Sequence, residues 1–140
     1  DSVFGEPFLL SEESQHYDVC AKSETRVLFI AYEHVIKRCE NACKFHSQLV
    51  SNLLQMIALR ASQQANRIYV LSRNSTRKKI MAYLNSIAAE KQTKTVILPM
   101  SYTTLAEYLS VDRSAMMREL KNLADEGIIE RDGKKLRILD

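Results

Sequence analysis

The chain has 140 residues, of which 46% are hydrophobic, and 20 Lys and Arg against 17 Asp and Glu give a formal net charge of +3. This many apolar side chains can fill a core, which excludes a wholly disordered chain. The charge is uneven, because residues 1–72 hold 7 basic and 8 acidic side chains and residues 73–140 hold 13 and 9. The second half therefore favours an anionic partner.

The apolar residues are too dispersed for a membrane span. No run approaches the roughly 20 residues that cross a bilayer, and the first residues lack the pattern of a signal peptide. We therefore expect a soluble, cytoplasmic protein with no membrane partner. The three cysteines, Cys20, Cys39 and Cys43, are odd in number and irregularly spaced, which argues against a disulfide framework and favours reduced thiols.

Residues 1–31 read as the end of a β-rich domain. Segments 17–21 and 25–30 carry the apolar and β-branched residues of strands in a partly buried sheet. Two or three strands bury too little apolar area to be stable alone. We therefore expect the chain to begin inside a domain.

From about residue 32 to residue 90 the chain has no Gly or Pro and is predicted to be largely helical. A heptad seam, with alternate spacings of 4 and 3, predicts a dimerisation helix from about residue 42 to residue 71. Leu49, Leu53 and Met56 form a second row that is expected to pack on the chain's own sheet. The alternative is an ordinary buried helix of a monomer, but a polar residue within the seam, Gln64, favours a dimer with a fixed register. The seam consists of Val50, Leu54, Ile57, Ala61, Gln64, Ile68 and Leu71.

A second helix is predicted to start at a cap on Asn74 or Ser75 and to run to about residue 89. Its apolar face follows i, i+4, i+7, i+8 spacing and consists of Ile80, Leu84, Ile87 and Ala88. A polar loop, 90–94, then leads into a short strand at 96–98 that Pro99 ends.

Residues 101–123 predict two short helices joined by a tight turn. Ser101 can cap the first helix, and Asp112, after a turn at 110–111, can cap the second. The positions predicted to be buried are Leu105, Ala106 and Leu109 on the first helix and Met116, Leu120, Leu123 and Ala124 on the second.

The other face of the second helix is basic and able to form hydrogen bonds. It carries Arg113, Ser114, Met117, Arg118 and Lys121. Arg can donate two hydrogen bonds to guanine in the major groove, and Lys near the helix end can reach a phosphate, so this face predicts a recognition helix for double-stranded DNA. The competing interpretation is a solvated basic face on a structural helix. Ser101 and Thr103 are further predicted DNA contacts.

A β-hairpin is predicted directly after this helix. Gly127 ends the helix, and the strands 128–131 and 136–139 flank the turn signal Asp132-Gly133. Such a hairpin is the wing of a winged helix-turn-helix. Four cations, Arg131, Lys134, Lys135 and Arg137, are expected near its tip, with Lys134 and Lys135 on the DNA backbone.

The order of sheet fragment, long helix and winged helix-turn-helix, with the stretch Leu-Ala-Asp-Glu-Gly-Ile-Ile at 123–129, resembles the Crp/Fnr family of bacterial transcription regulators. The family's recognition helix follows Ser-Arg-x-x-x-x-Arg-x-Leu. Here Asp112 replaces the Ser, Arg113 and Arg118 match the two DNA-contacting arginines, and Ser114 stands where many members have Glu.

The resemblance implies a mainly α fold with a small β component and three parts. These are the end of an effector-binding β-barrel (1–31), a helical linker with the dimerisation helix (32–72) and a winged helix-turn-helix (73–140). It implies a homodimer that binds a palindromic operator, with RNA polymerase and an unidentified small-molecule effector as further partners.

Phe4-Gly5-Glu6 is similar to the start of the family's cyclic-nucleotide cassette. The cassette's later Arg-Ser/Thr pair falls at Gln15 and His16, which lack the fixed positive charge that a buried phosphodiester requires. Cyclic AMP is therefore not the expected effector. The family's iron-sulfur cysteines have no match here, and no cofactor is expected.

Cys39, Cys43 and His46 share one helical face by i, i+4, i+7 spacing. Metal binding, redox pairing and ordinary packing are three interpretations, of which packing is the commonest for such a trio. No nucleophile-base motif or phosphate-binding Gly-rich loop indicates an enzyme. The main rival to DNA binding is a winged-helix module that binds proteins.

Overall fold

The computed structural model describes residues 3–5, 18–36 and 44–139. The chain divides into two compact units, residues 1–56 and 57–140, and the boundary lies inside the long helix α2, Lys44–Leu71. Among the described helices, none is both long enough and apolar enough to span a bilayer.

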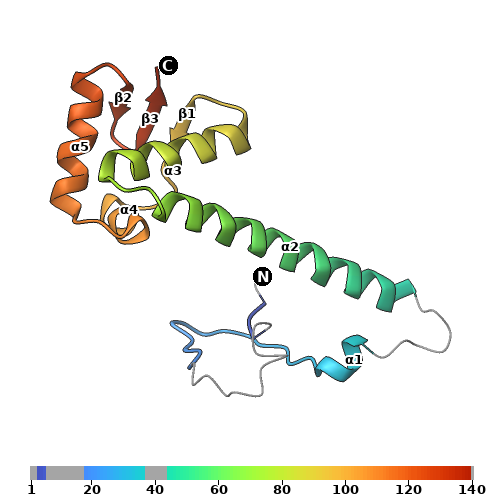
Figure 1. The fold of residues 1–140 in the computed structure, drawn as a ribbon. Helices are drawn as coiled ribbons and strands as arrows, with labels where there is room; N and C mark the ends of the chain where they lie inside the picture. The colour runs from blue at the N-terminus through green and yellow to red at the C-terminus, as the bar shows by residue number, and fades with distance from the viewer. Residues whose placement is uncertain (1–2, 6–17, 37–43, 140) are drawn as a thin grey trace. The chain divides into compact units, whose positions relative to one another are not determined.

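The first unit contains the short helix α1, Tyr32–Ile36, and the beginning of α2 (Figure 1). Residues 18–31 form neither helix nor strand, so the strand predicted at 25–30 and the described part of the strand predicted at 17–21 are corrected. The physical reason is pairing: a strand needs a neighbour to bond its backbone, and a sequence of strand-forming residues does not supply one. Leu28 and Phe29 are 82% and 87% exposed.

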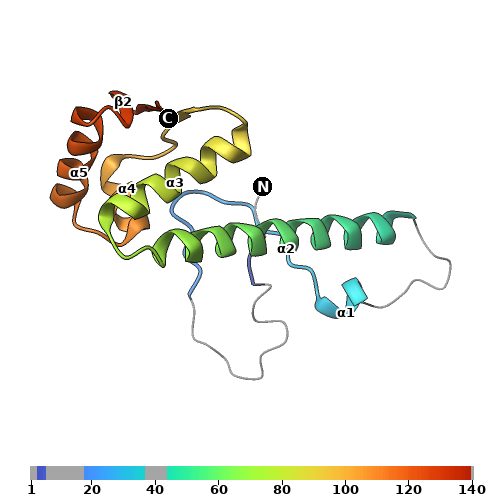
Figure 2. The ribbon, with the colours of Figure 1, turned by 45° about the horizontal axis from the view of Figure 1, so that its top comes forward.

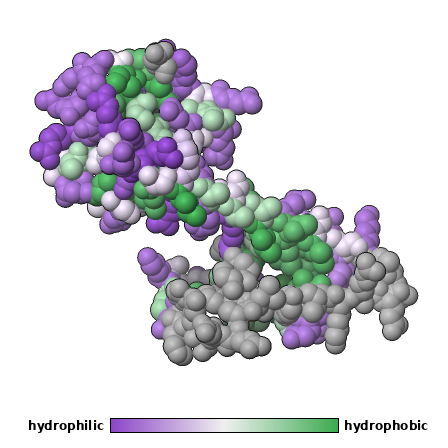
Figure 3. Space-filling view, in the orientation of Figure 1, coloured by the Kyte–Doolittle hydropathy of each residue, from purple (hydrophilic) through white to green (hydrophobic). Residues whose placement is uncertain are grey.

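Helix α2 has 28 residues, in agreement with the absence of Gly and Pro. The predicted seam residues are exposed along its length, apart from Leu71, which is half-buried. Leu54 and Ile68 are 66% and 67% exposed. Figure 3 shows hydrophobic surface along this helix, whereas much of the visible surface of residues 73–139 is hydrophilic.

The second unit contains three further helices and a three-stranded sheet, seen from two directions in Figures 1 and 2. The end of α2 is followed by α3, Thr76–Lys91, and β1, Thr95–Ile97. The helix pair α4, Tyr102–Leu109, and α5, Arg113–Asp125, comes next, and β2, Ile129–Asp132, and β3, Lys135–Ile138, complete the chain. This is the predicted winged helix-turn-helix order.

The sheet is antiparallel, with strand order β1-β3-β2. Asp132 pairs with Lys135, so the two-residue turn consists of Gly133 and Lys134, one position later than predicted from Asp132-Gly133. Gly133 has a φ of +54°, which a glycine adopts without the steric cost that a Cβ brings. The later turn places Lys134 at the tip of the hairpin.

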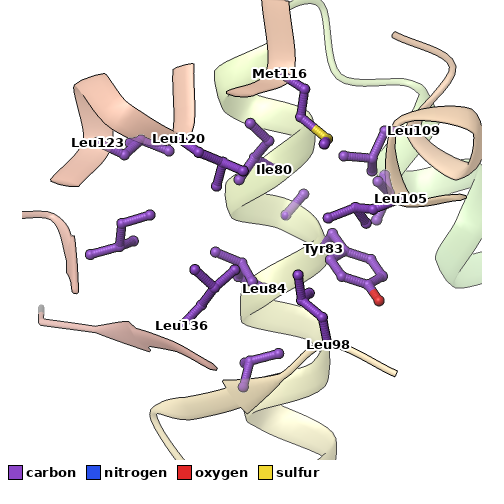
Figure 4. Packing of buried hydrophobic residues seen from close by; sticks show 14 of the residues in the cluster. Ile80, Tyr83, Leu84, Leu98, Leu105, Leu109, Met116, Leu120, Leu123 and Leu136 are labelled. Atoms are coloured by element: carbon purple, nitrogen blue, oxygen red, sulfur yellow. The ribbon is translucent and has the colours of Figure 1, made fainter. Parts of the chain in front are cut away.

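The core lies between α3, α4, α5 and the sheet (Figure 4). Ile80 and Leu84 of α3 are 1% and 0% exposed, and Tyr83 packs beside them. Burial of each Leu or Ile side chain stabilises the folded state by about 1.5–3 kcal/mol. This packing holds α4 and α5 against α3. The predicted buried positions of α4 and α5 are confirmed, except that Ala124 is only half-buried. The other core residues labelled in Figure 4 are Leu98, Leu105, Leu109, Met116, Leu120, Leu123 and Leu136.

Candidate nucleic-acid interface

The first helix of the pair, α4, is capped at both ends as its sequence requires. The Ser101 side chain accepts a hydrogen bond from the Thr104 backbone N–H at 3.1 Å. At the other end Ser110 is left-handed, with a φ of +51°, and its backbone N–H bonds the carbonyls of the last turn. Lys79 Nζ of α3 donates a hydrogen bond to the Leu109 carbonyl at 3.1 Å. The positive charge of the lysine interacts favourably with the partial negative charge at the C-terminus of α4.

The second helix, α5, begins at Asp112. Its carboxylate accepts a hydrogen bond from the Ala115 backbone N–H at 2.9 Å and one from the Ser114 hydroxyl at 2.6 Å. The Ser114 hydrogen bond, followed by the Ala115 hydrogen bond and the charge of Arg118, lowers the pKa of Asp112. The acid at the cap is therefore charged at neutral pH and orients the Ser114 hydroxyl.

The outward face of α5 presents Arg113, Ser114, Arg118 and Lys121, all exposed. The opposite face, with Met116, Leu120 and Leu123, has no exposed area. Met117, predicted on the exposed face, is half-buried and packs against the core. It lies at the edge between the two faces, where a flexible thioether can fill a gap. Three cations and one hydroxyl thus share a solvent-facing surface on a helix that the core holds in place.

The wing cations do not all lie on one face of the hairpin, which corrects the expected single cluster near the tip. Neighbouring residues of a strand point to opposite faces, so the strands separate them. Arg137 pairs with Glu130 at 3.7 Å on the outer sheet face, where Lys135 lies opposite Asp132. Arg131 instead lies over the Tyr102 ring, 5.8 Å from its centroid.

That outer sheet face carries both signs of charge around a surface depression. The lining residues are Lys94, Thr95, Glu130, Asp132, Lys135 and Arg137. Because the acidic side chains offset part of the basic charge, this face attracts a polyanion less than its Lys and Arg alone would suggest. Lys134, exposed in the turn between the strands, is the cation placed furthest along the wing.

Comparison with known proteins agrees with this geometry. Residues 78–140 match the model of the Crp-like helix-turn-helix domain. Because of this similarity, residues 78–140 are referred to below as the Crp-like domain. It begins in the first turns of α3 and includes the helix pair and the wing.

Two further relatives were found. The chain is 39% identical over 70 residues to the probable transcriptional regulator flp of Lacticaseibacillus casei. That match covers 50% of this chain and 32% of the relative, so the chain spans about a third of the curated protein. A solved structure from Eubacterium rectale, described as a transcriptional regulator of the Crp/Fnr family, is 24% identical to this chain with a TM-score of 0.46. The match covers 65% of this chain and 42% of the Eubacterium rectale chain.

In the second unit, an ion-pair cluster that the sequence reasoning missed joins α3 to α5. Arg77, in the first turn of α3, forms a two-pronged ion pair with Glu126 at the end of α5 and lies 3.5 Å from Glu119. The hydrogen bond with Arg77 lowers the pKa of Glu126, and the same bond raises the pKa of Arg77. Arg77 and Glu126 are 49 residues apart in sequence. Local spacing patterns predict contacts only between residues a few positions apart, so they could not predict this ion pair.

A second missed residue is Tyr102, the first residue of α4, which lies within the Crp-like domain. Its hydroxyl donates to the Gly133 carbonyl at 2.5 Å, in the wing turn. On the other side of the turn, the Leu98 backbone N–H donates to the Lys134 carbonyl at 3.0 Å. Both carbonyls of the turn are therefore bonded to other parts of the domain.

The candidate sites in the first unit lie largely outside the described residues. Gly5 is described, with a φ of +97°, whereas Glu6, Gln15 and His16 are not. Of the Cys39, Cys43 and His46 trio, only His46 is described, and it is half-buried on α2. Among the residues described, no group of three or more His, Cys, Asp or Glu side chains is placed to hold a metal ion.

Proposed function

We propose that the protein is a sequence-specific, DNA-binding transcription regulator of the Crp/Fnr type. The observation that supports this most directly is the outward face of α5, where Arg113, Arg118 and Lys121 are exposed over a fully buried inner face. In helix-turn-helix proteins the second helix of the pair enters the major groove. The two arginines read guanines, and Lys121 contacts a phosphate.

The rest of the interface contacts the DNA backbone. Ser101 and Thr103, at the exposed start of α4, offer hydroxyl groups to phosphate oxygens. Lys134 and Lys135 approach the neighbouring backbone from the wing, with Lys134 contributing more because Lys135 lies opposite Asp132. These contacts set the register of α5 in the groove without specifying sequence.

The protein acts as a homodimer through the α2 seam, whose large apolar side chains are exposed at Val50 (40%), Leu54 (66%), Ile57 (46%) and Ile68 (67%). A row of apolar side chains at heptad spacing on a solvated helix face is the pattern of a coiled-coil partner surface. A two-fold dimer places two recognition helices about 34 Å apart, which requires an inverted-repeat operator. RNA polymerase is the further protein partner that a regulator of this type implies.

A small molecule other than cyclic AMP is the effector. Gln15 and His16 replace the Arg and the Ser or Thr that the Crp/Fnr cassette uses to neutralise and bind a cyclic phosphate. Neither side chain carries a permanent positive charge at neutral pH, so a buried phosphodiester would lose its hydration without a compensating ion pair.

Selection of duplexes from a random pool by the full-length protein tests the proposal. We expect enrichment of an inverted repeat, and binding that weakens steeply as salt rises because phosphate contacts release counterions. Recovery of unrelated sequences with equal affinity would contradict sequence readout. Binding that does not respond to salt would instead favour the protein-interaction module.

A further inference from the structure

Two hydrogen bonds hold the wing turn of the Crp-like domain. A hairpin turn commonly extends into solvent with its carbonyls bonded to water. Here the Tyr102 hydroxyl bonds the Gly133 carbonyl, and the Leu98 backbone N–H bonds the Lys134 carbonyl. The Tyr102 ring is half-buried and Arg131 lies over it, which limits its freedom to rotate away.

Tyr102 lies between two groups of expected phosphate contacts. On its own helix the neighbours are Ser101 and Thr103, both exposed at the start of α4. Across its hydrogen bond lies the turn, with Lys134 exposed. One side chain therefore links the start of α4 directly to the wing turn.

We propose that Tyr102 is a positioning residue for the DNA backbone, which holds Lys134 and the start of α4 in one rigid phosphate-binding surface. This inference rests on the proposed DNA-binding function. The hydroxyl itself need not contact DNA, because its hydrogen is already donated to Gly133. By holding the wing turn in place, Tyr102 lowers the entropy that Lys134 would lose when it binds DNA. Preorganisation of this kind strengthens binding without adding a contact.

Tyr102→Phe tests the inference because it removes only the hydroxyl and keeps the ring beneath Arg131. The full-length protein is titrated against a duplex that it has selected from a random pool. Loss of one neutral hydrogen bond should weaken binding by about two- to tenfold. If Tyr102 acts through Lys134, adding Tyr102→Phe to Lys134→Ala should cause no further loss, whereas independent contributions would multiply. Multiplication of the two losses would overturn the proposal.

Tyr108→Phe is the matched control, because Tyr108 lies on the same helix but packs against Tyr83, away from the wing. It should leave binding unchanged. A loss equal to that of Tyr102→Phe would attribute the effect to α4 stability and overturn the positioning role.

Amide hydrogen exchange without DNA gives a second, independent measurement. In Tyr102→Phe the Leu98 amide, which donates to the Lys134 carbonyl, should exchange faster, while the Leu120 amide in α5 should not change. An unchanged Leu98 rate would refute the inference even if DNA binds. If no duplex binds the wild-type protein but Leu98 exchanges faster, the proposed DNA-binding function fails while the hold of Tyr102 on the turn stands.

Discussion

Individual side chains at the start of α5 set which hydrogen bonds the protein can offer to a base. The Ser114 hydroxyl donates its hydrogen to the Asp112 carboxylate at 2.6 Å, and the lowered pKa of Asp112 keeps that carboxylate charged. Ser114 then presents only lone pairs to the major groove. The groups that can donate to it there are the amino groups of cytosine and adenine.

We therefore expect cytosine or adenine at the base that Ser114 contacts. Ser114→Ala should reduce that preference by about 1 kcal/mol, the net value of one hydrogen bond. Asp112→Gly keeps a residue that is tolerated at the helix cap but removes the carboxylate that binds the Ser114 hydroxyl. The hydroxyl can then donate to guanine or thymine, so the affinity for duplexes with these bases at the same position should rise. Competition binding against duplexes that vary at each operator position measures both effects. Unchanged base preference in both variants would remove Ser114 from the readout.

At the scale of an element, the turn between α4 and α5 determines how the helix pair is held. Ser110 adopts a left-handed conformation, with a φ of +51°, in order to end α4. This conformation costs a residue with a Cβ about 1–2 kcal/mol and costs glycine little. Ser110 therefore carries backbone strain that a glycine at this position would avoid.

Ser110→Gly should raise the free energy of unfolding by about 0.5–1 kcal/mol, because relief of strain exceeds the extra flexibility of glycine in the unfolded chain. Ser110→Val should lower the free energy of unfolding, since a β-branched residue is least tolerant of a positive φ. Urea denaturation of the two variants provides the comparison. Equal stabilities would show that the turn is not held in the left-handed conformation.

The elements from α3 to the end of the chain were predictable from sequence because their signals are local. Ser101 and Asp112 cap helices as predicted, and Ser75 is the one of the two candidates, Asn74 and Ser75, that caps α3. The spacing of Leu105 and Leu109 likewise identified a buried face. Residues 25–30 show the limit of such signals: β-branched and aromatic residues favour a strand, but a strand forms only when another strand bonds it.

The candidate interface was predictable on α5 and less so on the wing. Helical spacing placed Arg113 and Arg118 on the exposed face, as observed. The wing depends on pairing, and a shift of one residue in the turn moved Asp132 into the strand opposite Lys135. Arg77 and Tyr102 were missed because their partners lie 49 and 31 residues away in sequence.

At the scale of the whole molecule, dimerisation is the first expectation that follows from α2. Ile57→Asp combined with Ile68→Asp places charges on the exposed apolar seam and should convert a dimer to monomers, because an unpaired charge is costly in an apolar interface. Analytical ultracentrifugation measures the result. Ser51→Asp with Ser62→Asp, at exposed α2 positions outside the seam, serves as the matched control. A double seam variant that sediments like the wild type would refute the seam.

Ligand choice is the second expectation at this scale. Cyclic AMP should bind weakly or not at all to the intact protein, because Gln15 and His16 do not supply the charge that holds its phosphate. Restoring Arg and Ser at these two positions should raise the affinity. Calorimetry distinguishes the cases, and a micromolar dissociation constant for the wild type would show that the phosphate is bound by other groups.

The central claim, that α5 reads DNA sequence, is tested most directly by titrating the full-length protein and its variants against the selected operator and a scrambled duplex at several salt concentrations. Arg113→Ala and Arg118→Ala should each cost about 1–3 kcal/mol per half-site contact on the operator and little on the scrambled duplex. Lys121→Ala should weaken both duplexes alike and reduce the salt slope by about one unit per contact. Equal losses on the two duplexes for the arginine variants would contradict the assignment of sequence readout to α5.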